Sequence, residues 1–299
     1  MNTPRVVVRG TWVIAALALL ASGTGLLLGS GPGPTPFTTL HGEEVTLYGQ
    51  GLYRFDTLLL GSGFRGQDAV VLAVGVPLLL LTAGRFRAGS LRGGLALAGT
   101  LAFLLYLSAS LAFGAAYNPL FPVYVALFSA NLFTLVTLLG SLNARAVSRR
   151  AGEAVPRRAA AAFLFGVGAV LLVVWGGLSL LPALVGGRVP PELANSTTLV
   201  THTLDLGVIV PAALLTGVLL RRRAPLGDVL APVLLVLSAL MGLTIGVATV
   251  AQALAGYPYT PGQLAALVAP FVLLALVGLG LTRRWFRALS GGPLRGELA

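Results

Sequence analysis

The sequence predicts an all-α integral membrane protein with eight transmembrane helices and both termini in the cytoplasm. Composition and the distribution of arginine support this fold class. Of 299 residues, 56% are hydrophobic and 10% are charged, whereas an ordinary soluble domain has about 25% charged residues. The length would suit two soluble domains, but a chain this apolar is better divided by the roughly 20 residues that cross a hydrocarbon core.

Eight apolar runs are long enough to be considered as spans. The first is longer than the roughly 7 to 15 apolar residues of a signal peptide, so we expect an uncleaved anchor; a cleaved signal peptide is the alternative. The runs end at arginine, proline or glycine, which are common at helix ends. They comprise residues 12–28, 68–84, 94–115, 120–142, 159–184, 198–220, 229–254 and 263–281.

The longest polar connection, residues 30–67, follows the first run. Within it, residues 55–60 form an apolar stretch that is too short to span and is followed by glycines. We expect a short interfacial or re-entrant turn there. The connection therefore predicts a small extracytoplasmic structure rather than a tether.

Arginine supplies all the positive charge, because the chain has no lysine. Alternate connections and the two tails hold 17 of the 20 arginines. A missed span would move every later connection to the other side and remove this bias, so the bias also supports the number of spans. Positive charge collects on the cytoplasmic side, so this side is predicted to be cytoplasmic. The 17 are Arg5, Arg9, Arg85, Arg87, Arg92, Arg145, Arg149, Arg150, Arg157, Arg158, Arg221, Arg222, Arg223, Arg283, Arg284, Arg287 and Arg295.

Landmarks recur at a nearly constant spacing and predict an internal duplication. Asp68 and Asp205 are 137 residues apart, and Pro119 and Pro258 are 139 apart. Positive-inside bias alone would align the arginines, so chance matching of equivalent loops is the alternative. Four helices per repeat is an even number, which predicts a parallel repeat. The predicted repeats are residues 1–149 and 150–299, within one membrane domain.

Asp205 is the most unusual group within an apolar run. It follows His202 by three residues, which places both on one helical face near the outer surface. Ionisable groups in a membrane usually have a partner or line a cavity. We expect a polar cavity formed by His202, Asp205, Asp68 and Arg65. The alternatives are that Asp205 caps or hydrogen-bonds the start of its helix beside a solvated His202, and that Asp68 caps its helix or pairs with Arg65.

The outer connection carries four further candidate partners for that cavity. They are His41, Glu43, Glu44 and Asp56. Convergence of His41, His202 and Asp205 would provide ligands for a divalent metal, but no dense spacing motif supports it.

No cofactor is predicted. The absence of cysteine excludes thiolate-bound metals, and the absence of lysine excludes a retinal Schiff base. Two histidines cannot ligate a pair of bis-histidine haems.

These residues leave three classes of function open. Small-solute or ion transport through an outward-facing polar cavity is favoured by the duplication, by prolines within the spans and by the carboxylates. The alternatives are a membrane-embedded enzyme at the extracytoplasmic face, including a metal-dependent hydrolase, and an accessory subunit of a membrane complex.

The predicted partners are the bilayer and, at the arginines, anionic lipid headgroups. A second copy of the chain or another membrane protein is also left open. Nucleic acid is not expected, because the arginines lie in short clusters between apolar runs. Arginine as the sole basic residue, with abundant alanine, leucine and glycine, favours a bacterial inner membrane.

Overall fold

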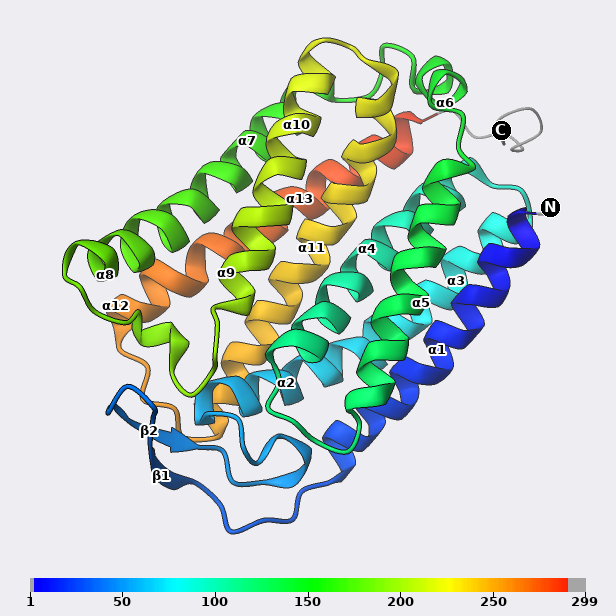
Figure 1. Ribbon diagram of the computed structural model, residues 1–299. Coiled ribbons are helices and arrows are strands. Elements are labelled where there is room, and N and C mark those ends of the chain that lie inside the picture. The colour runs from blue at the N-terminus through cyan, green and yellow to red at the C-terminus, as the bar shows by residue number, and fades with distance from the viewer. Residues whose placement is uncertain (1–2, 290–299) are drawn as a thin grey trace.

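The computed structural model describes residues 3–289, which form a bundle of long helices (Figure 1). Eight helices of this described part are long and apolar enough to cross a membrane. The chain is therefore a multi-pass membrane protein with helical spans, as its composition predicts. Arg295 lies outside the described residues.

Several spans are built from consecutive helical segments. Segments η2, η3, η5 and η6 are π-helical and continue directly into α-helix. In chain order the spans are α1 (Thr3–Leu27); α2 (Leu58–Val70), η2 (Val71–Gly75) and α3 (Val76–Arg87); α4 (Leu91–Gly114); α5 (Phe121–Gly140); α7 (Arg157–Leu171), η3 (Leu172–Leu180) and α8 (Leu181–Val185); α9 (Val200–Leu204), η5 (Asp205–Ile209) and α10 (Val210–Arg221); α11 (Pro225–Leu254); and α12 (Pro261–Gln263), η6 (Leu264–Val268) and α13 (Ala269–Ala288).

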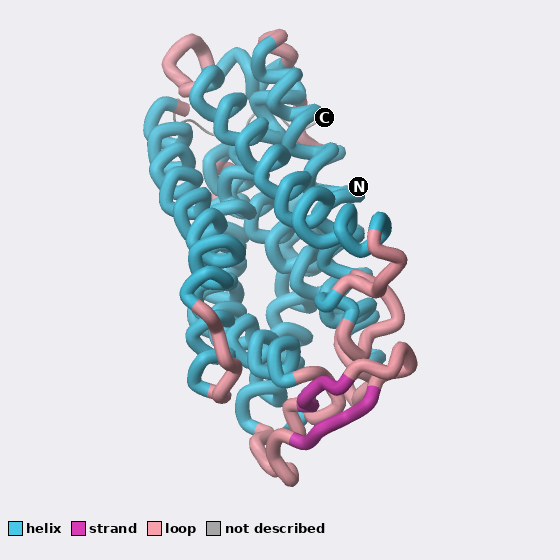
Figure 2. Tube along the Cα trace, turned by 90° about the vertical axis from the view of Figure 1, so that its left-hand side faces the viewer, coloured by secondary structure: helices cyan, strands magenta, loops and turns pink. Residues whose placement is uncertain are grey.

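The two ends of the bundle differ in their connections. At one end, which we call the loop face, strands β1 (Thr35–Thr38) and β2 (Glu44–Leu47) form an antiparallel hairpin, followed by the single turn η1 (Gly51–Tyr53). The turn η4 (Pro191–Leu193) lies in another connection at this face. The start of α1, the end of α13 and the short helix α6 (Ala144–Ala151) lie at the opposite, arginine-rich face (Figures 1 and 2).

The second span begins earlier than the sequence predicts. It starts at Leu58 rather than at residue 68, so the predicted 30–67 connection ends ten residues sooner and Arg65 lies inside α2. The glycines that indicate a break are packing residues here: a Cβ on Gly66 would lie 2.6 Å from the Ala248 Cα in α11. Small residues permit this close approach of two membrane helices.

The arginine-rich half of the bundle is tightly packed. Val7, Leu95 and Trp285 have no exposed surface and belong to one apolar cluster. At its edge the buried carboxylate of Asp228 receives two hydrogen bonds of 2.8 Å from the guanidinium of Arg157. The loop-side half holds a second, smaller apolar cluster that includes Tyr53 and Tyr124, and two cavities lie in the same half.

Two π-helical segments precede the same pair of residues. The segment η2 leads into Val76-Pro77, and η5 leads into Val210-Pro211. Proline lacks an N–H and clashes with the carbonyl four residues earlier, so a widened turn before it relieves the clash.

The two Val-Pro pairs are 134 residues apart. If the two halves are aligned on these pairs, Asp68 corresponds to His202 rather than to Asp205. The duplication itself stays a prediction. The predicted boundary between residues 149 and 150 falls inside α6.

Candidate functional site

Two adjoining cavities occupy the loop-side half of the bundle. The inner cavity, of about 300 Å³, lies among α2, α4, α7, η3, α9, η5, α11 and α13. The outer cavity, of about 430 Å³, is bounded by β2, by the connection before α9 and by the turn after α11. Six residues line both: Leu59, Leu60, Phe64, Ser110, Trp175 and Thr201. The cavities therefore lead from the loop face towards the middle of the membrane domain.

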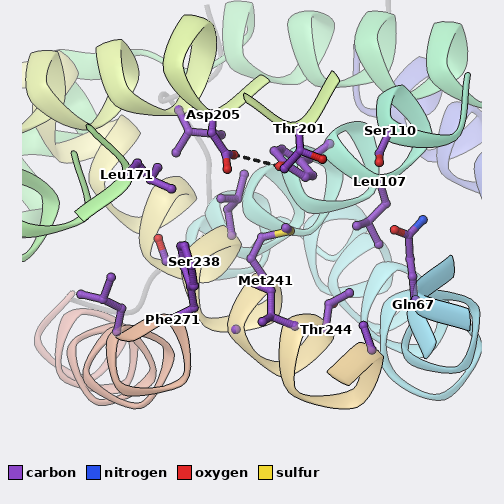
Figure 3. Close-up of a pocket in the computed structure, with 18 of the residues that line it drawn as sticks. Gln67, Leu107, Ser110, Leu171, Thr201, Asp205, Ser238, Met241, Thr244 and Phe271 are labelled. Carbon is purple, nitrogen blue, oxygen red and sulfur yellow. Dashed lines mark hydrogen bonds between the residues drawn. The ribbon is translucent and has the colours of Figure 1, made fainter. Parts of the chain in front are cut away.

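Asp205 lies in the wall of the inner cavity, at the first position of η5 (Figure 3). Its Oδ1 accepts a hydrogen bond of 2.8 Å from the Tyr106 hydroxyl, and its Oδ2 accepts one of 2.7 Å from Trp175 Nε1. These two donors come from α4 and η3, so the carboxylate joins three spans. Both donors are neutral, and they orient the carboxylate without cancelling its charge.

Several other polar groups of the inner cavity form no hydrogen bond within the described part of the protein. Gln67 is 7% exposed, and its Nε2 has no hydrogen-bond partner among the described residues. Ser110, Thr201 and Ser238 also donate no hydrogen bond to the part of the chain that the structure describes, unlike Thr82, Thr100 and other hydroxyls that bond to their own helix. Figure 3 shows Gln67 and Asp205 on different sides of the cavity. The cavity thus offers free polar groups to a ligand.

Among the described residues, no arginine lines either cavity, although the whole chain has 20 arginines. The acidic groups that line them are Asp205 in the inner cavity and Glu192 in the outer one. The charged groups that line the cavities are therefore acidic, whereas the whole chain has a net charge of +11.

A serine links the acid and the histidine of the outer cavity. Ser179 Oγ lies 2.8 Å from Glu192 Oε2 and 3.0 Å from His202 Nε2. Ser179 donates its single proton to Glu192, so a hydrogen bond between Ser179 Oγ and His202 Nε2 requires the histidine tautomer that carries its proton on Nε2. A histidine in this state cannot accept the serine proton, so the cluster resembles a brace between η3 and the connection before α9 more than an activated nucleophile.

Asp68 and Arg65 do not line either cavity, although the sequence grouped them with Asp205. Asp68 is fully buried between α1 and α2 and accepts a hydrogen bond of 2.7 Å from the Tyr53 hydroxyl. Arg65 donates to the Tyr48 hydroxyl and to the Leu26 carbonyl, both at 3.0 Å. These contacts fasten the loop structure onto the helix ends.

The predicted loop partners separate into two groups. His41, Glu43 and Glu44 are exposed on the hairpin. Asp56 is buried, and its Oδ1 accepts a hydrogen bond of 2.8 Å from the Ala116 N–H. Burial raises the pKa of Asp56 to about 7, against a smaller lowering by that hydrogen bond. Within residues 3–289, no three histidine or acidic side chains converge to hold a metal ion, and His41 does not join His202 and Asp205.

Sequence reasoning placed His202 and Asp205 at cavities but missed their partners. Tyr106 and Trp175 are ordinary in membrane helices and carried no signal on their own. Glu192 and Ser179 were not selected, since each is a lone polar residue in or near an apolar run. Gln67 was counted within the outer connection, and its place beside a cavity follows only from the earlier start of α2.

Comparison with protein-family models, with curated proteins and with solved structures finds no match for this chain.

Proposed function

We propose that this protein binds a small solute in the inner cavity and carries it across the membrane. The observation that supports this most is the pair of adjoining cavities, which lead from the loop face to a carboxylate at Asp205 and stop at packed apolar side chains. A site inside the membrane domain, reached from one side only, is what alternating access requires in one of its states.

The helices around the cavities have features that favour rearrangement. The π-helical segments η3 and η5 lie in spans that line the inner cavity, and Pro211 follows η5. In such turns the backbone hydrogen bonds differ from those of a regular α-helix, and π-helical turns occur often at functional sites. Helices interrupted in this way are a recurrent feature of carrier binding sites.

In the proposed orientation the loop face is extracytoplasmic and the arginine-rich face is cytoplasmic. The arginine clusters support it through the positive-inside rule. The same clusters would contact anionic lipid headgroups of a bacterial inner membrane.

The lack of cysteine makes orientation and access directly measurable. Ser110→Cys places a thiol at the wall shared by both cavities, and Ala154→Cys places one on the arginine-rich face. A membrane-impermeant maleimide added to intact cells is expected to label Ser110→Cys and to leave Ala154→Cys unlabelled until the membrane is opened. The reverse pattern would overturn the orientation.

Transport is tested by uptake into proteoliposomes across a panel of cationic, neutral and anionic solutes. Asp205→Asn keeps the shape of the side chain and removes its charge, so we expect it to lower uptake at least about tenfold if the carboxylate binds the solute. Glu44→Gln, an exposed carboxylate on the hairpin, is the matched control and should leave uptake unchanged. Equal uptake by Asp205→Asn and the unaltered protein would contradict the proposal.

A membrane-embedded enzyme at the loop face is the second candidate. The outer cavity at the loop face, which His202 and Glu192 line, is the observation that favours it. If the enzyme is metal-dependent, the purified protein should contain a stoichiometric divalent metal. Elemental analysis that finds no such metal would exclude a metal-dependent enzyme. An accessory subunit, the third class, predicts instead that the protein co-purifies with a fixed partner and loses stability without it.

A further inference from the structure

We infer that the ligand of the inner cavity is a small organic monocation, such as a protonated amine with an apolar or aromatic body. This inference rests on the proposed function and specifies its substrate class. Three features of the cavity carry it: one carboxylate without a cationic partner, a mostly aromatic and aliphatic wall, and polar groups that lack partners.

The carboxylate of Asp205 is the first feature. It is 8% exposed, and within the described chain it forms no ion pair; its hydrogen bonds come from the neutral groups of Tyr106 and Trp175. An ionised carboxylate in a low-dielectric surrounding is costly unless a positive charge approaches it. Because no arginine of residues 3–289 lines the cavity, a cationic ligand is the natural source of that charge.

The aromatic wall is the second feature. Phe64, Trp175 and Phe271 line the same cavity as Asp205, and the rings of Trp175 and Phe271 are stacked with centroids 6.4 Å apart. Aromatic faces attract organic cations through the ring quadrupole and bury apolar groups at the same time. A hydrated metal ion would gain little here, because Mg²⁺ and Ca²⁺ require about six or more oxygen ligands.

The unpaired polar groups are the third feature. The carboxamide of Gln67 lies across the cavity from Asp205 and has an unpartnered Nε2 (Figure 3). The hydroxyls of Ser110, Thr201 and Ser238 line the cavity too. A buried polar atom without a partner is unfavourable. These groups are therefore expected to bond to water in the empty cavity and to the ligand once it has displaced that water. They favour an amine that carries a second polar group.

The outer cavity is suited to the same charge. Glu192 lines it, again without arginine, so a cation meets negative charge on the way to Asp205. A cleft lined by one sign of charge raises the local concentration of the opposite ion.

The test compares three phenyl compounds of nearly equal size that differ in charge. They are 2-phenylethylamine, which is protonated near neutral pH, the neutral 2-phenylethanol, and the anionic 3-phenylpropanoate. Binding to the purified full-length protein is measured by isothermal titration calorimetry. We expect the amine to bind at least about tenfold more tightly than the alcohol, and the anion to bind most weakly.

Asp205→Asn is expected to remove the preference for the amine over the alcohol, while Glu44→Gln should retain it. Equal binding of amine and alcohol by the unaltered protein, tighter binding of the anion, or no binding of the amine would each overturn the inference. The charge series on the unaltered protein decides this even if Asp205→Asn does not fold.

Protection of Ser110→Cys from maleimide separates this inference from the proposed function. If the alcohol or the anion protects the thiol and the amine does not, the ligand class is wrong and the cavity still binds solute. If no solute in the uptake panel protects the thiol or is transported, the proposed function fails as well.

Discussion

Trp175 donates its indole N–H to the carboxylate of Asp205 at 2.7 Å. The same indole ring lies against the imidazole of His202, with centroids 4.3 Å apart. One side chain of η3 therefore contacts an ionisable residue in each cavity, Asp205 in the inner and His202 in the outer. This contact, together with the hydrogen bond from Tyr106, determines where the carboxylate points.

Removing either donor to Asp205 should destabilise the protein. Tyr106→Phe and Trp175→Phe each keep an aromatic ring, and each is expected to lower the free energy of unfolding by about 1.5–3 kcal/mol, the range for hydrogen bonds to charged groups. The double variant should lose more than the sum, because the carboxylate is then buried without a donor. Denaturation in detergent micelles measures this. Tyr117→Phe, at a side chain 78% exposed, is the control; equal stability of Tyr106→Phe and Tyr117→Phe would refute the prediction.

The buried ion pair at the arginine-rich face should be important for stability. Asp228 is 1% exposed and receives hydrogen bonds from Arg157 and from the Ser148 hydroxyl. Arg157→Met leaves that carboxylate without its cation and is expected to cost about 3–5 kcal/mol. Arg158→Met, at an exposed neighbour, should change the free energy of unfolding little. The prediction is wrong if the two variants unfold at the same denaturant concentration.

Stability should fall as pH rises through the range in which Asp56 titrates. Burial raises the pKa of Asp56 to about 7 from 3.8, so between these values the folded protein binds more protons than the unfolded chain. The free energy of unfolding therefore decreases with increasing pH across this window and is constant above it, with a total change of no more than about 4 kcal/mol.

Asp56→Asn removes this titration and keeps an acceptor for the Ala116 N–H. The difference in melting temperature between this variant and the unaltered protein should grow in favour of Asn as pH is raised from acid to neutral. Glu44→Gln should show no such trend, since Glu44 is exposed on the same loop structure. A difference that does not vary with pH would exclude Asp56 as the titrating group.

Close packing of α2 on α11 should depend on Gly66. A Cβ at this position would lie 2.6 Å from the Ala248 Cα, which is backbone and cannot turn aside. Gly66→Ala is expected to destabilise the protein by about 1–3 kcal/mol, the usual cost of overpacking. Gly84→Ala meets no atom within 4 Å and should be tolerated. Similar melting temperatures for both variants would show that α2 can shift away from α11.

Reasoning from the sequence was accurate on the number of candidate spans and less accurate on where they begin. Glycine caused the largest error: Gly61, Gly63 and Gly66 indicate a break to local reasoning, whereas in the fold they lie inside α2 and face neighbouring side chains or backbone. Glycine both interrupts helices and lets them pack closely, and only the neighbouring helix distinguishes these roles. The sidedness of the chain and the internal duplication stay predictions.

The sequence by itself determined that the chain is a multi-pass helical membrane protein and that His202 and Asp205 are its unusual polar residues. Both follow from local composition, because burial in lipid requires long apolar runs and makes any charge within them conspicuous. The tertiary structure decided that Tyr106, Trp175 and Gln67 share a cavity with Asp205, and that Asp68 does not. Such groupings depend on how each helix is rotated and which helix lies beside it, and these are set by packing between residues far apart in the chain.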